Sequence, residues 1–280
     1  MKRLLLMAVV AMATVTNGWG QHPDPFVSDN LDEDFYSFIR TPPAVTSGEF
    51  AYDFYHYQFG RELRELDGVS EQAISDEAAK LYDVFNKDVI GIDLNEETTP
   101  EIILLCERAV SDVHKSNTTV KKKYQRIRPF ATFHDPSLKP EEDEEEAKTF
   151  SYPSGHSSRG YMYALVLCTV MPEHTTQIMR RAQQYAYNRV ICGHHWKSDT
   201  DASLVLASTM FAYIVCTDAY QAQLAKARAE YQALKGDPTA VRALDATRKQ
   251  SARIYHIDGT PADETARGIV IENGQKHVAR

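Results

Sequence analysis

Three short segments of this chain place basic side chains, histidines, a glycine and an aspartate at spacings that suit chemistry on an anion. The first, KKKYQRIRPF, holds Lys121 and Arg128 seven residues apart. Seven residues make two helical turns, so both side chains can point from one face of a helix that Pro129 then ends. Basic runs are more often solvated surface, so this segment carries weight only together with the others.

The second segment, SYPSGHSSR, is followed directly by the apolar run GYMYALVLCTVM. The pattern predicts a buried helix that starts near Ser154, Gly155 and His156. The first N–H groups of a helix have no intrahelical acceptor, the helix dipole adds positive potential, and glycine lets an anion approach the backbone closely. The segment therefore suits a phosphate group. The competing interpretation is an ordinary serine N-cap with a surface histidine.

The third segment, NRVICGHHWKSD, contains an arginine and a spaced histidine–aspartate pair. Arg189 supplies a planar fork of donors that matches phosphate oxygens. Asp199 lies four residues after His195, so its carboxylate can accept from Nδ1–H and leave Nε2 with a lone pair for attack. His194 is the rival nucleophile, but its corresponding partner is Ser198. The competing interpretation is a purely structural His195–Asp199 pair.

Together the three segments supply the parts of an in-line phosphoryl transfer, whose catalysis is mostly positioning and charge neutralisation. We expect neutral His195 to attack phosphorus, while protonated His156 gives its proton to the departing oxygen and later activates water. Because one histidine must be neutral and the other charged, the rate should follow a bell-shaped pH dependence in which the two groups titrate as a pair.

These segments resemble the three-part signature of the type 2 phosphatidic acid phosphatase and vanadium haloperoxidase superfamily. The matching pattern is Lys121-x6-Arg128-Pro129, then Pro153-Ser154-Gly155-His156, then Arg189-x5-His195-x3-Asp199. The stretches YQRIRPF, SYPSGHSS, RVICGHHWKSDTDA and QLAKARAEY, and a motif that begins Phe50-x2-Asp53-x3-Tyr57, resemble its soluble secreted branch, the class A bacterial non-specific acid phosphatases. The likeness runs from about Thr41 to about Tyr231.

The resemblance implies a helical bundle that hydrolyses many phosphomonoesters through a phosphohistidine, with no required metal or other cofactor. By position, His195 would be the nucleophile, Asp199 its orienter and His156 the general acid. The phosphoryl oxygens would be held by Lys121, Arg128, Ser154, Gly155 and Arg189.

Two positions depart from the family pattern. Asn188 stands where a serine usually precedes the arginine, and we expect it to alter a hydrogen bond near the phosphate. Arg159 stands where an apolar residue is expected, and we expect it at the rim of the pocket.

The elements that must position these residues are mostly helices. The stripe in SEQAISDEAAKLYDVFNKDVI predicts one amphipathic helix, and TPEIILLCERAVSDVHK opens a second with Thr99 as N-cap and Pro100 in first position. PEHTTQIMRRAQQYAYNRV predicts a third, a buried helix runs on from Asp201, and QAQLAKARAEYQALKG ends at Gly236. Alternating strand patterns are scarce, so we expect an all-α fold, a single helical bundle.

Two segments differ from the bundle pattern. The run EEDEEE, Glu141–Glu146, lacks the glycine turn of a calcium loop, so a solvated loop is favoured over a calcium site. Residues 237–280 are expected to form a linker and a short β-like C-terminal tail, with a hairpin at Asn273-Gly274. Within it, RGIVIENGQKHV resembles the sorting segments of type IX-secreted proteins.

Residues 1–20 have the layout of a secretory signal peptide: Lys2 and Arg3, an apolar run, then small residues. The apolar run is shorter than the roughly 20 residues that a membrane span needs, so cleavage is favoured over an anchor. We expect residues 21–236 to be the phosphatase domain, with no membrane span after cleavage. The protein would be periplasmic, or secreted to the cell surface, in a bacterium.

The chain has 280 residues and a formal net charge of -8, and removal of Lys2 and Arg3 makes it more acidic. An acidic surface argues against nucleic acid as a partner, which leaves small-molecule phosphomonoesters. Homo-oligomer formation is left open. So is disulfide pairing, since three pairings are available to the four cysteines, Cys106, Cys168, Cys192 and Cys216.

The expected function is thus a secreted acid phosphatase with a broad substrate range, and three alternatives stand beside it. A vanadate-dependent haloperoxidase would use the same ligands, because vanadate mimics the phosphoryl transition state. A membrane lipid phosphatase is disfavoured by the lack of further apolar spans. A non-catalytic secreted phosphate-binding protein would need neither the His195–Asp199 pair nor His156.

Overall fold

The computed structural model describes residues 23–27, 31, 34–77 and 80–236, together with the backbone of four short strands near the C-terminus. Its α-helices are α1 Phe50–Leu63, α2 Val69–Ser75, α3 Leu81–Val84, α4 Lys87–Ile90, α5 Pro100–Tyr124, α6 Pro129–Phe133, α7 Asp143–Glu146, α8 Gly155–Val170, α9 Thr175–Ile191, α10 Lys197–Ile214 and α11 Asp218–Leu234. Two 3-10 helices, η1 Asp34–Phe38 and η2 Pro172–His174, precede α1 and α9.

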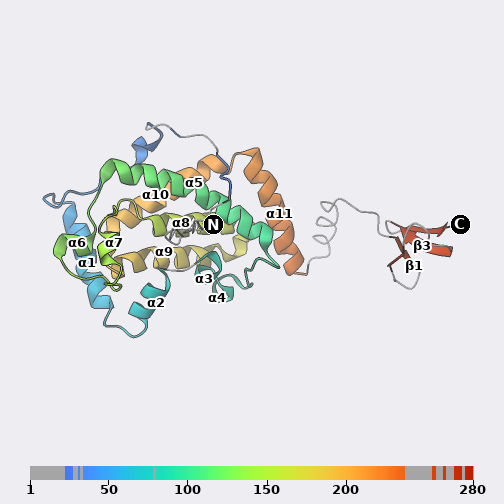
Figure 1. Ribbon diagram of the computed structural model, residues 1–280, viewed down its shortest axis with the longest axis horizontal. Coiled ribbons are helices and arrows are strands. Elements are labelled where there is room, and N and C mark those ends of the chain that lie inside the picture. The colour runs from blue at the N-terminus through green and yellow to red at the C-terminus, as the bar shows by residue number, and fades with distance from the viewer. Residues whose placement is uncertain are drawn as a thin grey trace, which may run out of the picture.

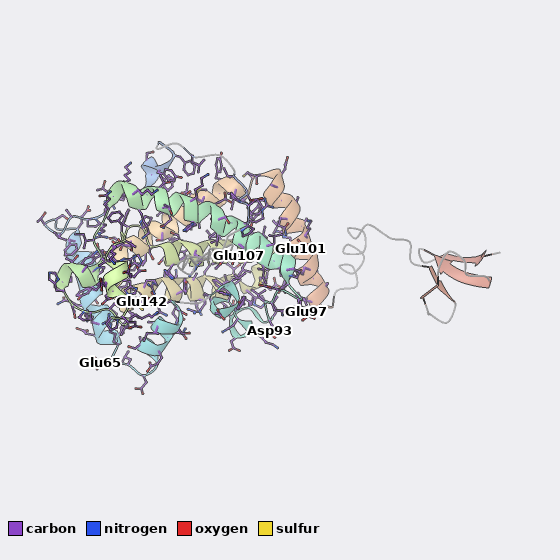
Figure 2. All side chains as sticks on the ribbon, in the orientation of Figure 1. Glu65, Asp93, Glu97, Glu101, Glu107 and Glu142 are labelled. Carbon is purple, nitrogen blue, oxygen red and sulfur yellow. The ribbon has the colours of Figure 1, made fainter. Side chains whose placement is uncertain are left out.

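Helix α8 lies at the centre of the bundle, with α5, α9 and α10 packed around it (Figure 1). Its sequence explains this position, because it buries residues on every side, from Tyr161 and Met162 to Val166 and Leu167. Helix α11 packs across α5. Exposed carboxylates such as Glu65, Asp93 and Glu97 project from the outside (Figure 2). The predicted all-α helical bundle is confirmed.

The start of α5 is capped by another helix. Pro100 is its first residue, as predicted, but the Thr99 hydroxyl bonds to Asn95 instead of capping the helix. The free N–H groups of Glu101 and Ile102 donate instead to the carboxylate of Glu230 on α11, at 3.1 and 2.9 Å. A carboxylate at a helix N-terminus also suits the helix dipole, so this contact fixes α11 against α5.

Helix α5 ends earlier than the sequence predicts. It stops at Tyr124, where Gln125 adopts a left-handed conformation with φ 47°, and Pro129 begins the short helix α6. A residue before proline avoids the helical region, and Arg128 is accordingly extended. Lys121 and Arg128 therefore do not share a helix face, although both reach the same cavity.

The prediction of a single amphipathic helix for the stretch SEQAISDEAAKLYDVFNKDVI is wrong. The described part of this stretch forms the three short helices α2, α3 and α4. Directly after α2, Asp76 binds Arg181 of α9 at 2.5 Å, and Glu77 binds Arg189 of α9 at 2.9 Å. These ion pairs join the end of α2 to α9, and periodicity alone cannot reveal such distant partners.

The tail contains β1 Ile254–His256, β2 Pro261–Ala262, β3 Gly268–Glu272 and β4 Gln275–Ala279, in an antiparallel sheet of order β2-β1-β3-β4. Because Glu272 pairs with Gln275, the hairpin predicted at Asn273-Gly274 has the expected register; the two turn residues themselves lie outside the described residues. Residues 1–20, predicted to be a signal peptide, also lie outside them.

Across the described residues, none of the helices alone has the length and apolarity to cross a bilayer. Helices α10 and α11 meet that test only as a pair bent by 96°.

Candidate active site

A cavity of about 200 Å³ brings together residues from all three segments that the sequence analysis singled out. Among the side and main chains that line it are those of Lys121, Arg128, Gly155, His156, Arg189 and His195. Asp199 is buried directly behind His195. Segments separated by more than 60 residues in the chain thus face one small, cationic chamber.

The His195 ring is held between a carboxylate and a guanidinium. Its Nδ1 lies 3.3 Å from Asp199 Oδ2, and its Nε2 lies 3.1 Å from Arg128 Nη1. Since an arginine can only donate, Nε2 must accept, and the proton must sit on Nδ1 facing Asp199. Burial and the charges of Arg128 and Lys121 lower the pKa of His195 well below its usual range. The ring is therefore neutral, with its lone pair on Nε2.

Asp199 is fixed by a buried network that the sequence analysis did not find. It lies in the first turn of α10, where Oδ2 accepts from the Trp196 backbone N–H at 2.8 Å. Its Oδ1 accepts from Arg126 at 2.7 Å, and Arg126 also pairs with Asp53 at 2.7 Å. Asp53 in turn accepts from Ser198 of α10. Arg126 and Asp53 both occur in stretches that resemble the family, and this resemblance is the sequence feature that could have pointed to them.

Ser154 caps α8 and is not part of the cavity wall. Its Oγ accepts from the Ser157 backbone N–H at 3.3 Å, and its side chain is fully buried. In the structure, the Ser154 hydroxyl is thus the N-cap of α8. The contact with the phosphoryl group that the family resemblance implied for Ser154 stays a prediction. Gly155, the first residue of the helix, does line the cavity.

His156 projects into the cavity from the first turn of α8. Its Nε2 lies 3.0 Å from the carbonyl oxygen of Glu77, so this nitrogen carries a proton that it donates. Burial and the nearby charges of Arg189 and Arg159 lower the pKa of His156 well below its usual range.

Arg189 is completely buried, and part of its guanidinium is unpaired. Its Nη2 donates to Glu77 at 2.9 Å and to His194 Nδ1 at 2.6 Å. Its Nε and Nη1 have no partner among the described residues. A buried donor without a partner is costly, so these two N–H groups are suited to the oxygens of an anion.

His194, the alternative nucleophile to His195, is hydrogen-bonded to Arg189. Because the Arg189 guanidinium donates to His194 Nδ1, this nitrogen carries no proton. Burial lowers its pKa, and the charge of Arg189 lowers it further against the opposing effect of Glu77. For Glu77, burial raises the pKa, but the charge of Arg189 and the hydrogen bond that Arg189 donates outweigh burial and hold the pKa well below its usual range.

Lys121 and Arg128 both bind the segment that precedes the PSGH motif. Lys121 Nζ donates to the carbonyl oxygen of Phe150, and Arg128 donates to Thr149 Oγ1 at 2.7 Å. Arg128 also pairs with Glu146 at 2.6 Å. Burial and the neighbouring charge of Arg128 lower the pKa of Lys121 to about 7. Lys121 is thus a cation at acidic pH that loses its charge near neutrality.

The expectation of a solvated acidic loop holds for only part of the run EEDEEE. Glu141, Glu144 and Glu145 are exposed, but the Glu146 side chain reaches the cavity wall. Asp143 accepts from the Ser137 backbone N–H and so anchors the loop.

Neither departure from the family pattern lies where it was expected. Asn188 donates to Asp76 at 2.7 Å and joins the network that ties α2 to α9. Arg159 donates to the Tyr185 hydroxyl at 2.8 Å, between α8 and α9. Both side chains are absent from the cavity lining, because buried partners on neighbouring helices hold them elsewhere.

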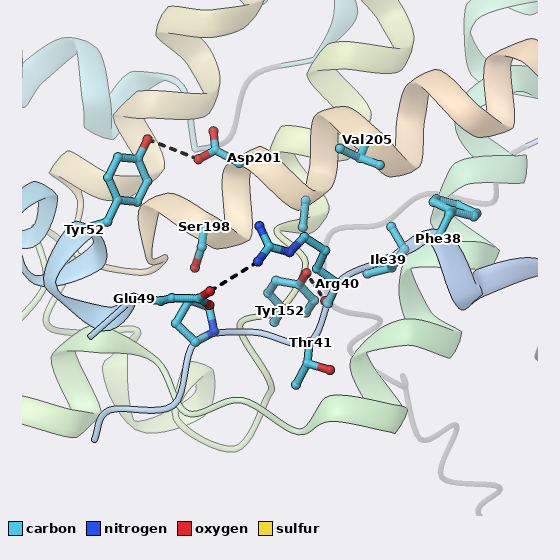
Figure 3. Close-up of a pocket in the computed structure, with 12 residues that line it drawn as sticks. Phe38, Ile39, Arg40, Thr41, Glu49, Tyr52, Tyr152, Ser198, Asp201 and Val205 are labelled. Carbon is cyan, nitrogen blue, oxygen red and sulfur yellow. Dashed lines mark hydrogen bonds and ion pairs between the residues drawn. The ribbon is translucent and has the colours of Figure 1, made fainter. Parts of the chain in front are cut away.

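A larger cavity, about 550 Å³, lies on another part of the surface (Figure 3). Its polar groups satisfy one another, since Arg40 pairs with Glu49 and Tyr52 donates to Asp201. None of the predicted site residues lines it, so size alone does not identify the site.

In the described part of the chain, no three histidine, cysteine, aspartate or glutamate side chains are grouped as metal ligands would be. The four cysteines are free thiols.

The PAP2 superfamily matches residues 102–223, which include all three segments. A non-specific acid phosphatase of Providencia stuartii is 36% identical over 217 residues, covering 76% of this chain and 87% of that protein. One of Salmonella typhi is 30% identical over 233 residues, 81% of this chain and 91% of that protein. An acid phosphatase of Zymomonas mobilis is 26% identical over 270 residues, 93% of this chain and 94% of that protein.

The chain therefore belongs to the PAP2 superfamily. Within it, the chain is a member of the class A bacterial non-specific acid phosphatases, as the resemblance in the sequence implied.

Proposed function

We propose that this protein is an acid phosphatase that hydrolyses phosphomonoesters through a phosphohistidine on His195, without a metal. The observation that carries the proposal is the pair of contacts of His195: Nδ1 lies 3.3 Å from Asp199 Oδ2, and Nε2 lies 3.1 Å from Arg128 Nη1 at a cavity lined by buried cations. The relatives named as acid phosphatases support the reaction class. The lowered pKa of His195 keeps this nucleophile neutral in acid, where an acid phosphatase must work.

Substrate binding follows from the donors that face the cavity. The two unpaired N–H groups of Arg189 would take phosphoryl oxygens, with Lys121 and Arg128 neutralising their charge. The backbone at Gly155 adds the N-terminus of the 16-residue helix α8, which favours an anion. In this proposal the arginines and the lysine supply the charge stabilisation.

The chemical steps use the two histidines in turn. His195 Nε2 gives up its hydrogen bond from Arg128 and forms a bond to phosphorus as the bond to the leaving oxygen breaks. His156 donates a proton to that oxygen. The negative charge of a bound phosphoryl group would raise the pKa of His156, so its imidazolium forms with substrate present. Its Nε2 lies 3.0 Å from the Glu77 carbonyl oxygen, a contact that orients the ring. Water, deprotonated by His156, then cleaves the phosphohistidine.

Broad substrate range and export are also parts of the proposal. The cavity is small, at about 200 Å³, and its predicted contacts are all to the phosphoryl group, so the leaving group is weakly selected. The signal-peptide pattern of residues 1–20 supports export to the periplasm or cell surface. Residues 21–236 would be the catalytic domain, and residues 237–280 a linker and sorting tail.

Hydrolysis of p-nitrophenyl phosphate, measured at acidic pH with and without EDTA, tests the proposal. We expect equal rates, since the proposed chemistry uses only side chains and water. Complete loss of activity in EDTA, restored by a divalent metal, would contradict the metal-free mechanism. Phosphate binding without turnover would indicate a binding protein, and bromide oxidation with added vanadate a haloperoxidase.

The low pKa of Lys121 makes a specific prediction for pH dependence. Its charge is present below about pH 7 and lost above it, so kcat/KM should fall, by roughly tenfold for the lost charge, as pH rises through neutrality. Arginine stays charged, so Lys121→Arg should move this alkaline limb to higher pH.

Lys122→Arg, the same change at an exposed neighbour, is the control. The substrate itself also ionises in this pH range, but this ionisation affects the parent and both variants equally. An alkaline limb at the same pH in Lys121→Arg as in the control would show that Lys121 does not set it.

A further inference from the structure

Glu146 differs from the other carboxylates of its acidic run. Its Oε2 lies 2.6 Å from Arg128 Nη2, and its side chain is 35% exposed where that of Arg128 is 6% exposed. By contrast, Glu145 is 78% exposed and pairs with the exposed Lys148. Glu146 also lines the cavity, together with His195 and Arg189. A negative charge therefore stands inside a site whose other charged groups are suited to hold an anion.

The guanidinium of Arg128 is fully engaged by protein atoms. Its Nε donates to the Glu146 carbonyl and to Thr149, and its Nη1 donates to the His194 carbonyl and to His195 Nε2. Its Nη2 donates to Thr149 and to the Glu146 carboxylate. A phosphoryl oxygen can bind this arginine only by replacing one of these acceptors.

Of these acceptors, the Glu146 carboxylate is the one that a phosphoryl group would replace at least cost. Its side chain is 35% exposed, so water can solvate it after release, whereas the other acceptors are backbone oxygens, a neutral hydroxyl and the nucleophile. It is also the one negative charge among them, and two anions on one guanidinium repel each other. It ends α7, a helix of only four residues, which can shift without disturbing the bundle.

We propose that Glu146 competes with the phosphoryl group for Arg128 and thereby selects against substrates that carry a second negative group. This inference rests on the proposed phosphatase function and names a specificity residue for the same site. The released carboxylate remains at the wall of the cavity that His156, the proposed proton donor to the leaving group, also lines. Phosphomonoesters of neutral alcohols are therefore favoured over bisphosphates, whose second phosphate meets this charge.

Glu146→Gln tests the competition because it removes the charge and keeps the size. The matched control is Glu144→Gln, which makes the same change at an exposed position of the same run. The readouts are the Kd of inorganic phosphate by calorimetry, and kcat and KM for glucose 6-phosphate and glucose 1,6-bisphosphate. Circular dichroism verifies folding, and Glu146→Ala serves as a second variant.

We expect Glu146→Gln to lower the phosphate Kd and the KM for glucose 6-phosphate by roughly tenfold, with kcat unchanged. The KM for the bisphosphate should fall further, so that the preference for the monophosphate shrinks. Glu144→Gln should match the parent in all of these values.

Two results would overturn the inference. One is a phosphate Kd equal in the parent, Glu146→Gln and Glu144→Gln; the other is a Kd that rises in Glu146→Gln, which would mean that Glu146 supports Arg128. If the parent binds phosphate without hydrolysing the esters, the proposed function fails alone, and the comparison of Kd values still decides the role of Glu146. A parent that binds no phosphate overturns both.

Discussion

His195→Ala is expected to lower kcat for phosphomonoester hydrolysis by roughly 10⁴-fold or more. The proposed mechanism forms its covalent bond at His195 Nε2, and removal of a nucleophile costs losses of this size or larger. The donors of Arg189, Lys121 and Gly155 remain, so inorganic phosphate should still bind. Steady-state kinetics and calorimetry measure the two effects separately.

The control for this variant is His174→Ala, on η2 and outside the cavity lining. It should retain the activity of the parent. If the activity of His195→Ala lay within tenfold of that of the parent, His195 would not be the nucleophile, and His156 would be the next candidate.

Asp199→Asn is expected to lower kcat by roughly 10³- to 10⁴-fold with little change in KM. A carboxylate can only accept, so it holds the His195 proton on Nδ1, whereas an amide can donate to Nδ1 and favour the proton on Nε2. The lone pair would then point away from phosphorus. Loss of the negative charge also removes one of the two ion pairs of Arg126.

Asp201→Asn, in the same helix, provides the matched control. Asp201 pairs with Lys197 at the surface, and its side chain is 48% exposed. This variant should keep parental kinetics. Equal losses in both variants would indicate damage to α10, and a loss below tenfold in Asp199→Asn would show that the carboxylate does not determine the tautomer.

The sequence was sufficient to predict the bundle and most of the cavity. The PSGH segment had to start a helix, because a cap and a glycine precede an apolar run, and the structure begins α8 at Gly155. The spacing of His195 and Asp199 required a local contact, and the two side chains meet at 3.3 Å. Such features depend on residues within a few turns of one another, which a single sequence records.

Features that depend on distant partners could not be predicted. Asp76 and Glu77, at the end of α2, bind arginines more than 100 positions away. Arg126 pairs with Asp53 across 73 positions, and nothing in the local pattern separates it from the solvated lysines beside it. Glu146 lies in a run of like charges, and such runs are usually exposed to solvent. In each case, the partner of the side chain lies outside its local sequence pattern.

The most direct test of the account is a search for phosphate on His195 during turnover. Enzyme mixed with excess substrate would be quenched in base, where a phosphohistidine survives, and digested for mass spectrometry. We predict a base-stable, acid-labile phosphate on the peptide that contains His195, and none in His195→Ala. Rapid hydrolysis without any phosphorylated peptide, or the phosphate on His156 instead, would contradict the account.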